Sequence, residues 1–197
     1  MAILMLSKEY FFTEIIYQHH TCTIYSITLA NKVVHLTFSH EQHLHAVTLL
    51  RSTYGNCISN KQTDQYSPLI GQLEEYLTGR RQKFALPLAL LFLRRGTPFQ
   101  QQVWQQLDHI PYGKTRTYGC LATAIGAPKA ARAVGQALNS NPIALIIPCH
   151  RVVAAQGLGG FSGGVAIKEW LLRLEKKKAG GEEKQGWANN AGLTTDR

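Results

Sequence analysis

The fold of the C-terminal half is decided by one stretch, Thr117-Tyr-Gly-Cys-Leu-Ala-Thr-Ala-Ile-Gly-Ala-Pro-Lys-Ala-Ala-Arg-Ala-Val-Gly-Gln-Ala-Leu138. Leu121 and Ile125 lie one helical turn apart, Gly126-Ala-Pro128 breaks the pattern, and a second helix then runs to about Leu138. Two short helices joined by a three- or four-residue turn that contains glycine are typical of a helix-turn-helix. An ordinary hairpin of packed helices would give the same pattern, so DNA binding does not follow from this stretch alone.

The second helix of this pair has unusual side chains for a DNA reader. Ala130, Ala133 and Gly135 are small, and the long residues beside them are Lys129 and Arg132. This leaves few side chains that can read base edges. Small residues instead allow a helix backbone to approach a narrow groove closely, with Arg132 entering the base stack. The alternative is an alanine-rich helix that packs on its neighbours.

A candidate nucleophile follows in Asn141-Pro-Ile-Ala-Leu-Ile-Ile-Pro-Cys-His-Arg-Val-Val153. Its apolar residues predict a buried strand that ends at Pro148, and Cys149, His150 and Arg151 come directly afterwards. Cationic neighbours lower the pKa of a thiol, and a nearby histidine can accept its proton. Adjacent residues of a strand point to opposite faces, so Cys149 and His150 need a bend or a water between them. A buried structural cysteine is the alternative interpretation.

A glycine-rich loop over residues 157–164 and a final helix complete this half. The loop can bring backbone N–H groups close to a ligand, but it lacks the spacing and the Lys-Ser/Thr ending of a phosphate loop. The helix is expected to turn an apolar face inward, formed by Ile167, Trp170, Leu171 and Leu174. Near its start, Glu169 either orients a histidine or forms an i,i+4 surface pair with Arg173.

Composition and charge narrow the class of protein. The chain has 197 residues, 45% of them apolar, and a formal net charge of +9, which indicates a globular rather than a disordered protein. Residues 95–178 hold 11 basic and 3 acidic side chains. This half therefore favours a polyanionic partner, with nucleic acid as the leading candidate. A solvated cationic surface is the alternative.

Apolar runs and cysteines bear on the location of the protein. The longest apolar run, residues 86–93, is too short to cross a bilayer, and no basic segment of a secretory signal precedes the apolar N-terminus. The cysteines are scattered and include no CxxC pair: Cys22, Cys57, Cys120 and Cys149. We therefore expect free thiols, a cytoplasmic location and no membrane association. The histidines near residues 19–22 and 40–45 match no closed zinc pattern, so no metal is predicted.

The N-terminal half has the pattern of a small mixed α/β unit. Residues 23–29 and 33–38 are β-branched, partly alternating and separated by a short turn, which predicts a hairpin. Further along, Thr97 is followed by Pro98 and Gln100, which predicts a strong helix start. The amino-acid composition and the net charge of the chain change just before this helix, which indicates a domain boundary there.

The fold class expected from these patterns is an α/β N-terminal domain joined to a mostly helical C-terminal domain with a helix-turn-helix. We expect the N-terminal domain to span residues 1–92 and the C-terminal DNA-binding domain to span residues 93–178. Residues 179–197 lack periodicity and predict a flexible tail.

Eight short motifs follow one another in the C-terminal half: Gly96-Thr-Pro-Phe-Gln-Gln-Gln-Val-Trp104, Ile110-Pro-Tyr-Gly113, Thr117-Tyr118, Pro128-Lys-Ala-Ala-Arg-Ala-Val-Gly135, Asn141-Pro142, Pro148-Cys-His-Arg-Val152, Ser162-Gly-Gly164 and Lys168-Glu-Trp-Leu-Leu172. In this order and spacing they resemble the O6-alkylguanine-DNA alkyltransferase family, the methylated-DNA–protein-cysteine methyltransferases. The likeness in the N-terminal half is fainter, and there the resemblance implies a ribonuclease-H-like domain.

The resemblance implies direct-reversal DNA repair. Cys149 would take the alkyl group from O6-alkylguanine by an S_N2 displacement, with O4-alkylthymine as a second candidate substrate. His150 would deprotonate the thiol through a water, and Glu169 would orient His150. Tyr118 would donate a proton towards guanine N3 as the base leaves. Asn141 would act beside these groups in the pocket that holds the extruded base, whose other implied residues are Val152, Phe161, Ser162 and Lys168.

The resemblance also implies how double-stranded DNA is held. Arg132 would fill the gap left by the flipped nucleotide. The other implied DNA contacts lie on or near the second helix, which would enter the minor groove: Thr117, Lys129, Ala130, Ala131, Ala133 and Gly135. The thioether product has no good leaving group, so each molecule acts once and needs no cofactor. A monomer is expected.

Two rival functions remain at this stage. A cysteine hydrolase that uses Cys149 and His150 would show a burst followed by turnover. A helix-turn-helix regulator with a structural Cys149 would keep its DNA function in a Cys149→Ala variant. Such a regulator would read the major groove with long side chains, which Ala130 and Ala133 fit poorly.

Overall fold

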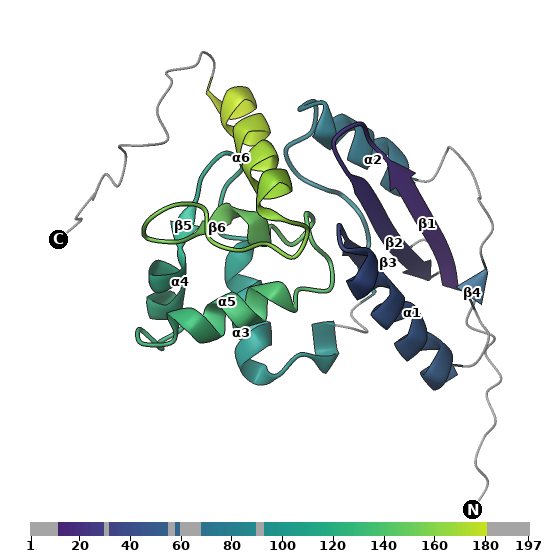
Figure 1. Cartoon of the computed structure of the whole chain (residues 1–197), viewed down its shortest axis with the longest axis horizontal. Coiled ribbons are helices and arrows are strands. Elements are labelled where there is room, and N and C mark those ends of the chain that lie inside the picture. The colour runs from purple at the N-terminus through teal and green to yellow at the C-terminus, as the bar shows by residue number, and fades with distance from the viewer. Residues whose placement is uncertain (1–11, 30–31, 55–57, 60–67, 90–92, 181–197) are drawn as a thin grey trace, which may run out of the picture.

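The computed structural model describes residues 12–29, 32–54, 58–59, 68–89 and 93–180. Figure 1 shows two groups of elements side by side, a small sheet with two helices and a mostly helical group. The elements of the first group are β1 (Phe12–Gln18), β2 (Thr23–Leu29), β3 (Lys32–Thr37), α1 (His40–Tyr54), β4 (Ile58–Ser59) and α2 (Pro68–Leu77). Those of the second are η1 (Leu93–Arg95), α3 (Pro98–Leu107), β5 (Arg116–Thr117), α4 (Tyr118–Ala124), α5 (Ala131–Asn139), η2 (Cys149–Arg151), β6 (Val152–Val153) and α6 (Val165–Ala179).

The N-terminal sheet has the strand order β3-β2-β1-β4. The predicted hairpin is confirmed, because β2 and β3 pair antiparallel from Tyr25↔Thr37 to Leu29↔Lys32, with a register shift at Ile27/Thr28. Strand β1 pairs antiparallel with β2 and parallel with β4. Helix α1 packs on one face of the sheet, and the other face contributes to the larger core.

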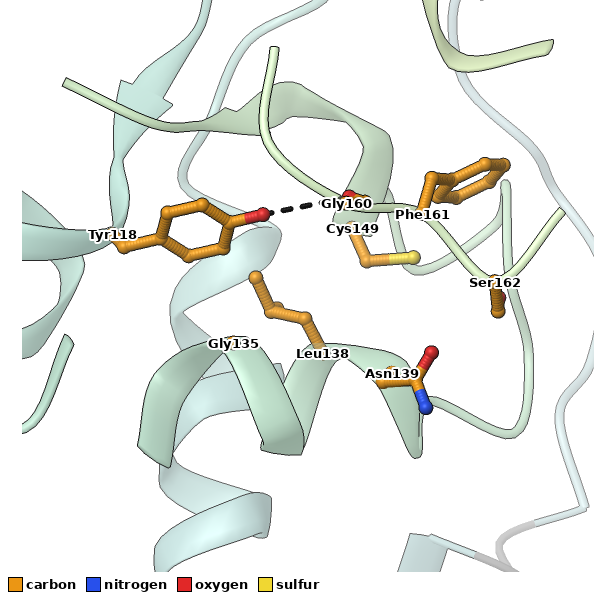
Figure 2. Close-up of a pocket in the computed structure, with 8 residues that line it drawn as sticks. All are labelled: Tyr118, Gly135, Leu138, Asn139, Cys149, Gly160, Phe161 and Ser162. Atoms are coloured by element: carbon orange, nitrogen blue, oxygen red, sulfur yellow. Dashed lines mark hydrogen bonds between the residues drawn. The ribbon is translucent and has the colours of Figure 1, made fainter. Parts of the chain in front are cut away.

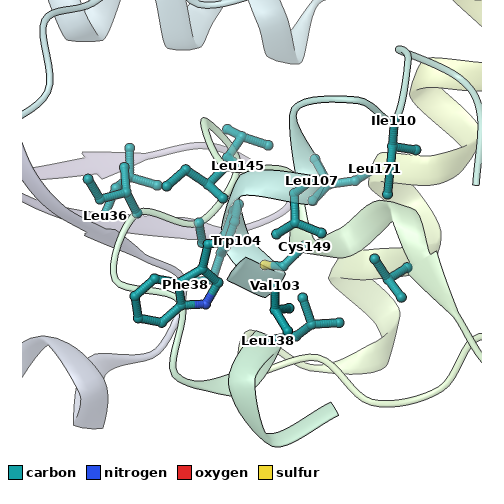
Figure 3. Packing of buried hydrophobic residues seen from close by; sticks show 14 of the residues in the cluster. Leu36, Phe38, Val103, Trp104, Leu107, Ile110, Leu138, Leu145, Cys149 and Leu171 are labelled. Atoms are coloured by element: carbon teal, nitrogen blue, oxygen red, sulfur yellow. The ribbon is translucent and has the colours of Figure 1, made fainter. Parts of the chain in front are cut away.

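The larger hydrophobic core runs through both groups of elements. Leu36 and Phe38 from the sheet belong to the same buried cluster as Trp104, Leu107 and other residues of the helical group (Figure 3). The indole N–H of Trp104 donates to the carbonyl oxygen of Ala137 at 2.7 Å, which ties α3 to α5. Because burying apolar surface is the main stabilising term in folding, a shared core fixes the two halves relative to each other.

Backbone hydrogen bonds join the sheet edge to the segment that precedes Cys149. The Leu36 N–H donates to the carbonyl of Pro142 at 2.9 Å, and the Ala144 N–H donates to the carbonyl of Leu36 at 2.8 Å. The segment is buried as expected, but it forms isolated bridges and a turn in place of a regular strand. Leu145 has a φ of 70°, a left-handed conformation that interrupts any extended run.

The predicted helix-turn-helix is present as α4 and α5. Its connection, residues 125–130, is longer than the expected turn, with Gly126 at a φ of 74°. The Thr97 start of α3 is also confirmed, because Thr97 and Gln100 form a reciprocal capping box.

Among the described residues, no helix is long and apolar enough to cross a membrane. The expected domain boundary at residue 92 and residues 181–197 of the expected tail lie outside the described residues, whereas Ala179, the first residue of that tail, belongs to α6.

Candidate active site

Cys149 lies at the start of the 3-10 helix η2 and is buried at the base of a pocket. The pocket is lined by Tyr118, Gly135, Leu138, Asn139, Cys149, Gly160, Phe161 and Ser162 (Figure 2). The tight 3-10 turn supplies the bend that Cys149 and His150 require, because successive side chains diverge by only a third of a turn.

His150 is fully buried and contacts a carboxylate that the sequence analysis did not assign to the site. Its Nε2 atom lies 2.6 Å from Oε1 of Glu175 on α6. The side chains of both residues have no exposed surface. This arrangement is that of a base whose ring orientation is fixed by a buried acceptor.

Glu175 is held by donors from several elements. Arg151 donates from Nε to Oε2 at 3.0 Å and from Nη2 to Oε1 at 3.1 Å, and the Gly113 N–H donates to Oε2 at 2.8 Å. The hydroxyl of Tyr76 on α2 donates to Oε1. Burial alone would raise the pKa of Glu175, but the hydrogen bonds from His150 and Tyr76 and the charge of Arg151 lower it to about 2. Glu175 is therefore ionised at neutral pH.

The protonation state of His150 follows from this partner. An ionised carboxylate can only accept hydrogen bonds, so Nε2 of His150 carries the hydrogen. The lone pair is then on Nδ1, which has no hydrogen-bond partner among the described residues. Burial lowers the pKa of His150 against the opposing effect of Glu175, which favours the neutral imidazole. His150 thus has the form of a general base with its basic nitrogen available.

The expected role of Glu169 as the residue that orients His150 is wrong. Glu169 forms an i,i+4 ion pair with Arg173 at 2.6 Å, and its side chain is 38% exposed. This is the surface pair that the sequence analysis held open as the alternative. Glu175 takes the orienting place because it lies on the face of α6 that packs against η2, whereas Glu169 lies on another face.

The buried face of α6 differs from the apolar face that was expected. Its buried residues are Lys168, Leu171, Leu172 and Glu175. Leu171 belongs to both faces, and Ile167 and Trp170 are partly buried against the core. Two of the fully buried side chains are charged, however, and an apolar stripe does not indicate them. A usable signal was present, because Lys168 and Glu175 are seven residues apart and therefore share one face of a helix. Once Lys168 is assigned to the pocket, Glu175 follows.

The thiol of Cys149 lies in surroundings that disfavour its ionised form. Burial raises the pKa of Cys149, and the hydrogen bond from Asn141 and the charge of Lys168 oppose this only in part. Asn141 also holds the preceding turn, since its Nδ2 donates to the carbonyl of Ile147 at 2.8 Å and its Oδ1 accepts from the Ile143 N–H at 3.1 Å. A thiol in this setting remains protonated until a neighbour takes the proton.

Lys168 is fully buried and bridges two segments of the site. Its Nζ donates to the carbonyl of Val152 at 2.6 Å and to that of Gly160 at 3.0 Å. Burial lowers the pKa of Lys168 to about 8, while Cys149 acts in the opposite direction. The side chain thus holds the glycine-rich loop against β6 and places a positive charge near the thiol.

Tyr118 begins α4 and lies along one wall of the pocket (Figure 2). Its hydroxyl donates to the carbonyl of Gly160 at 3.4 Å. Burial raises the pKa of Tyr118, so the phenol keeps its proton and can act as a donor at neutral pH. Gly135 of α5 and Gly159 of the loop lie close to its ring.

Gly159→Ala is expected to displace Tyr118 from the pocket wall. Gly159 has a φ of 68°, and a Cβ there would lie 2.6 Å from the Tyr118 hydroxyl and 2.8 Å from a ring carbon. Gly157→Ala is the matched control, because Gly157 has a φ of 83° with open space around the added carbon. Both variants carry the left-handed strain of about 1–2 kcal/mol. In single-turnover alkyl-transfer assays, we expect Gly159→Ala to be at least tenfold slower than Gly157→Ala. Equal rates would show that Tyr118 is not held by this contact.

The residues assigned to DNA contact lie at the start of α4 and on or just before α5. Lys129 and Arg132 are exposed. Ala130, Ala131 and Ala133 are half-buried, and Thr117 caps α4 by accepting from the Cys120 N–H at 3.1 Å. Gly135 lines the pocket from α5. One helix therefore carries both the exposed Arg132 and part of the pocket wall.

Within the described ranges, no group of three or more His, Cys, Asp or Glu side chains could hold a metal ion.

Comparisons with known proteins agree with this geometry. The DNA-binding domain of 6-O-methylguanine DNA methyltransferase matches residues 98–177, and the ribonuclease-like domain of the same family matches residues 36–90. A crystal structure of the Mycobacterium tuberculosis O6-methylguanine methyltransferase is 36% identical, with a TM-score of 0.69 over 87% of this chain and 96% of that one. The chain belongs to the 6-O-methylguanine DNA methyltransferase family.

Two further relatives refine the match within the 6-O-methylguanine DNA methyltransferase family. A methylated-DNA–protein-cysteine methyltransferase of Methanosarcina acetivorans is 55% identical over 105 residues, which are 53% of this chain and 65% of that protein. A structure of the M. tuberculosis protein in complex with DNA is 35% identical, with a TM-score of 0.63 over 85% of this chain and 93% of that one. The two-domain fold expected from the sequence is thus confirmed.

Proposed function

We propose that this protein repairs O6-alkylguanine in double-stranded DNA by transferring the alkyl group to Cys149, once per molecule. The observation that carries the proposal is the buried chain of groups at the pocket. Neutral His150 is fixed on ionised Glu175 at 2.6 Å, and its neighbour in the chain is Cys149, whose buried thiol lines the pocket. Members of the family with about half of their aligned residues identical to this chain are named for this transfer.

The chemical step balances without a cofactor. His150 Nδ1 takes the thiol proton, directly or through one water, and the Cys149 sulfur forms a bond to the alkyl carbon. The bond from that carbon to guanine O6 breaks, and its electron pair passes to the purine. Tyr118 donates a proton towards guanine N3, so that neutral guanine leaves. Asn141, Val152, Phe161, Ser162 and Lys168 would shape or hold the base pocket during this step.

The proposed DNA contacts follow from the placement of α5. Its small residues allow the backbone to approach the minor groove, and exposed Arg132 would enter the stack where the damaged nucleotide leaves. Because Gly135, Leu138 and Asn139 of the same helix line the pocket, a base flipped past Arg132 would arrive beside Cys149. A member of the family has been solved in complex with DNA.

A monomer suffices for this arrangement, since one chain supplies the pocket and the helix. We also propose a cytoplasmic location, which the free thiols of Cys22, Cys120 and Cys149 support.

The stoichiometry of the reaction tests this function. With a tenfold excess of O6-methylguanine duplex, we expect a rapid burst that ends when each protein molecule has accepted one methyl group. The reason is that a thioether has no leaving group that water can displace readily. Continued release of product after the burst would indicate a cysteine hydrolase. Tight lesion binding without any methyl transfer would indicate a regulator or lesion sensor.

A further inference from the structure

Tyr76 is a residue of the N-terminal domain that reaches the catalytic groups of the other domain. It lies on α2, is fully buried, and belongs to the core that spans both halves. Its ring stacks on Phe84 with centroids 4.9 Å apart, and Tyr112 meets it edge-on at 5.7 Å. Because the ring is packed on two sides, its hydroxyl has a defined position.

That hydroxyl contacts the carboxylate oxygen on which His150 depends. It donates to Oε1 of Glu175, the same atom that lies 2.6 Å from His150 Nε2, and it is 3.4 Å from Nε2 itself. Burial and the negative charge of Glu175 raise the pKa of Tyr76 well above its ordinary value. The hydroxyl therefore remains a hydrogen-bond donor throughout the neutral pH range.

Glu175 needs this donor because its other contacts leave one approach open. Arg151 and the Gly113 N–H hold Oε2, and Arg151 reaches Oε1 from the same guanidinium. Tyr76 approaches Oε1 from α2, which is a separate element. Without Tyr76, the donors left on Oε1 are His150 itself and the Arg151 guanidinium that also holds Oε2, so no separate element would fix Oε1 against Nε2.

We propose that Tyr76 is a positioning residue for alkyl transfer, through which the N-terminal domain holds Glu175 against His150. This inference rests on the proposed function and extends it, because it gives the N-terminal domain a part in the chemistry. Tyr76 does not touch the substrate or the thiol. It acts through Glu175, which fixes the ring of His150 and leaves Nδ1 free for the proton of Cys149.

The test compares Tyr76→Phe with Tyr112→Phe. The control removes a buried hydroxyl from the neighbouring ring, and that hydroxyl has no hydrogen-bond partner among the described residues. At saturating O6-methylguanine duplex, we expect Tyr76→Phe to transfer methyl about tenfold more slowly than Tyr112→Phe, with the same Kd for DNA. Equal transfer rates in the two variants would overturn the proposal.

A DNA-free measurement separates this inference from the proposed function. The rate at which iodoacetamide alkylates Cys149 reports thiol activation, whether or not the protein repairs DNA. We expect Tyr76→Phe to slow this reaction several-fold at pH 7. The defect should fade at alkaline pH, beyond the raised pKa of Cys149, because the thiol then ionises without help from His150. A defect of equal size at every pH would assign Tyr76 a packing role and would contradict the proposal.

The charged and titratable groups around His150 affect both variants alike in this pH profile. They are Glu175 and Lys168 from α6 and Arg151 and Cys149 from η2, all of which are present in both variants. A second comparison covers the case in which Tyr76→Phe lowers stability. In a His150→Gln background, Tyr76→Phe should cause no further loss of Cys149 reactivity. The reason is that Tyr76 acts through Glu175 on His150, and this background lacks the His150 imidazole. An equal loss in both backgrounds would overturn the proposal.

Discussion

A Cys149→Ser variant is expected to accept no methyl group from O6-methylguanine DNA while it still binds the lesion duplex. The serine hydroxyl is a much weaker nucleophile than a thiolate, and His150 cannot ionise it to a useful extent. The substitution changes one atom at the base of the pocket, so the exposed residues of α5 remain in place. Transfer followed by the mass of the intact protein should fall by several orders of magnitude, with Kd for DNA within about twofold of the parent.

Cys120→Ser is the control for this experiment. Cys120 lies on α4 and is exposed, which makes it the more accessible thiol of the two. If alkyl transfer needs a base and a pocket rather than mere exposure, this variant should keep the full rate. Loss of transfer in Cys120→Ser, with retention in Cys149→Ser, would contradict the assignment of the nucleophile.

Glu175→Gln is expected to cause the second large effect, because it removes the partner of both His150 and Arg151. The neutral amide cannot balance the positive charge of the Arg151 guanidinium. A buried charge left without its partner lowers the free energy of unfolding by about 3–5 kcal/mol. The NH2 group of the amide must also face either His150 and Tyr76 or Arg151 and the Gly113 N–H, so one of these sets of donors loses its acceptor. We expect alkyl transfer to fall at least a hundredfold, measured in single-turnover assays at a temperature where the variant is folded.

Glu169→Gln provides the matched control on the same helix. It removes only the surface pair with Arg173, and such pairs contribute at most about 0.5 kcal/mol. Its rate and its unfolding midpoint should both match those of the parent protein. A large rate loss in Glu169→Gln, with none in Glu175→Gln, would restore the role that the sequence analysis gave to Glu169.

The stability of the protein is expected to depend on pH through the ionisation of Glu175. The pKa of Glu175 is lowered to about 2 in the folded protein, below the ordinary glutamate value of about 4.3. Its stabilising contribution is therefore complete above pH of about 4.3 and is lost as the pH falls towards 2. Urea midpoints of the parent and of Glu175→Gln should converge over this window. A difference that stays constant on acidification would mean that Glu175 is not the group that titrates.

Much of the fold was predictable because its signals are local. The β2–β3 hairpin, the Thr97 capping box and the two helices of the helix-turn-helix each depend on residues close together in the sequence. The pair Cys149–His150 was found for the same reason, since the two residues are adjacent. The 125–130 connection was predicted too short because Gly126 and Pro128 mark a break but do not set its length.

The residues that were missed belong to the site through long-range contacts. Tyr76 and Glu175 are 99 positions apart in the chain and meet only because the two domains share a core. Glu175 was passed over because burying a carboxylate is costly unless it is fully paired, and its partners Arg151, Gly113 and Tyr76 come from separate segments. Sequence patterns favour apolar residues for buried faces, so the apolar stripe pointed away from Glu175, and only its seven-residue spacing from Lys168 indicated it.

The central claim is tested most directly by locating the methyl group after one round of reaction. The protein is mixed with an equimolar duplex that contains a single O6-methylguanine, and its peptides are then examined by mass spectrometry while the DNA is analysed for guanine. We predict one methyl group on the peptide that contains Cys149 and an equal amount of restored guanine. An unmodified Cys149 peptide after prolonged contact with the lesion would contradict the account.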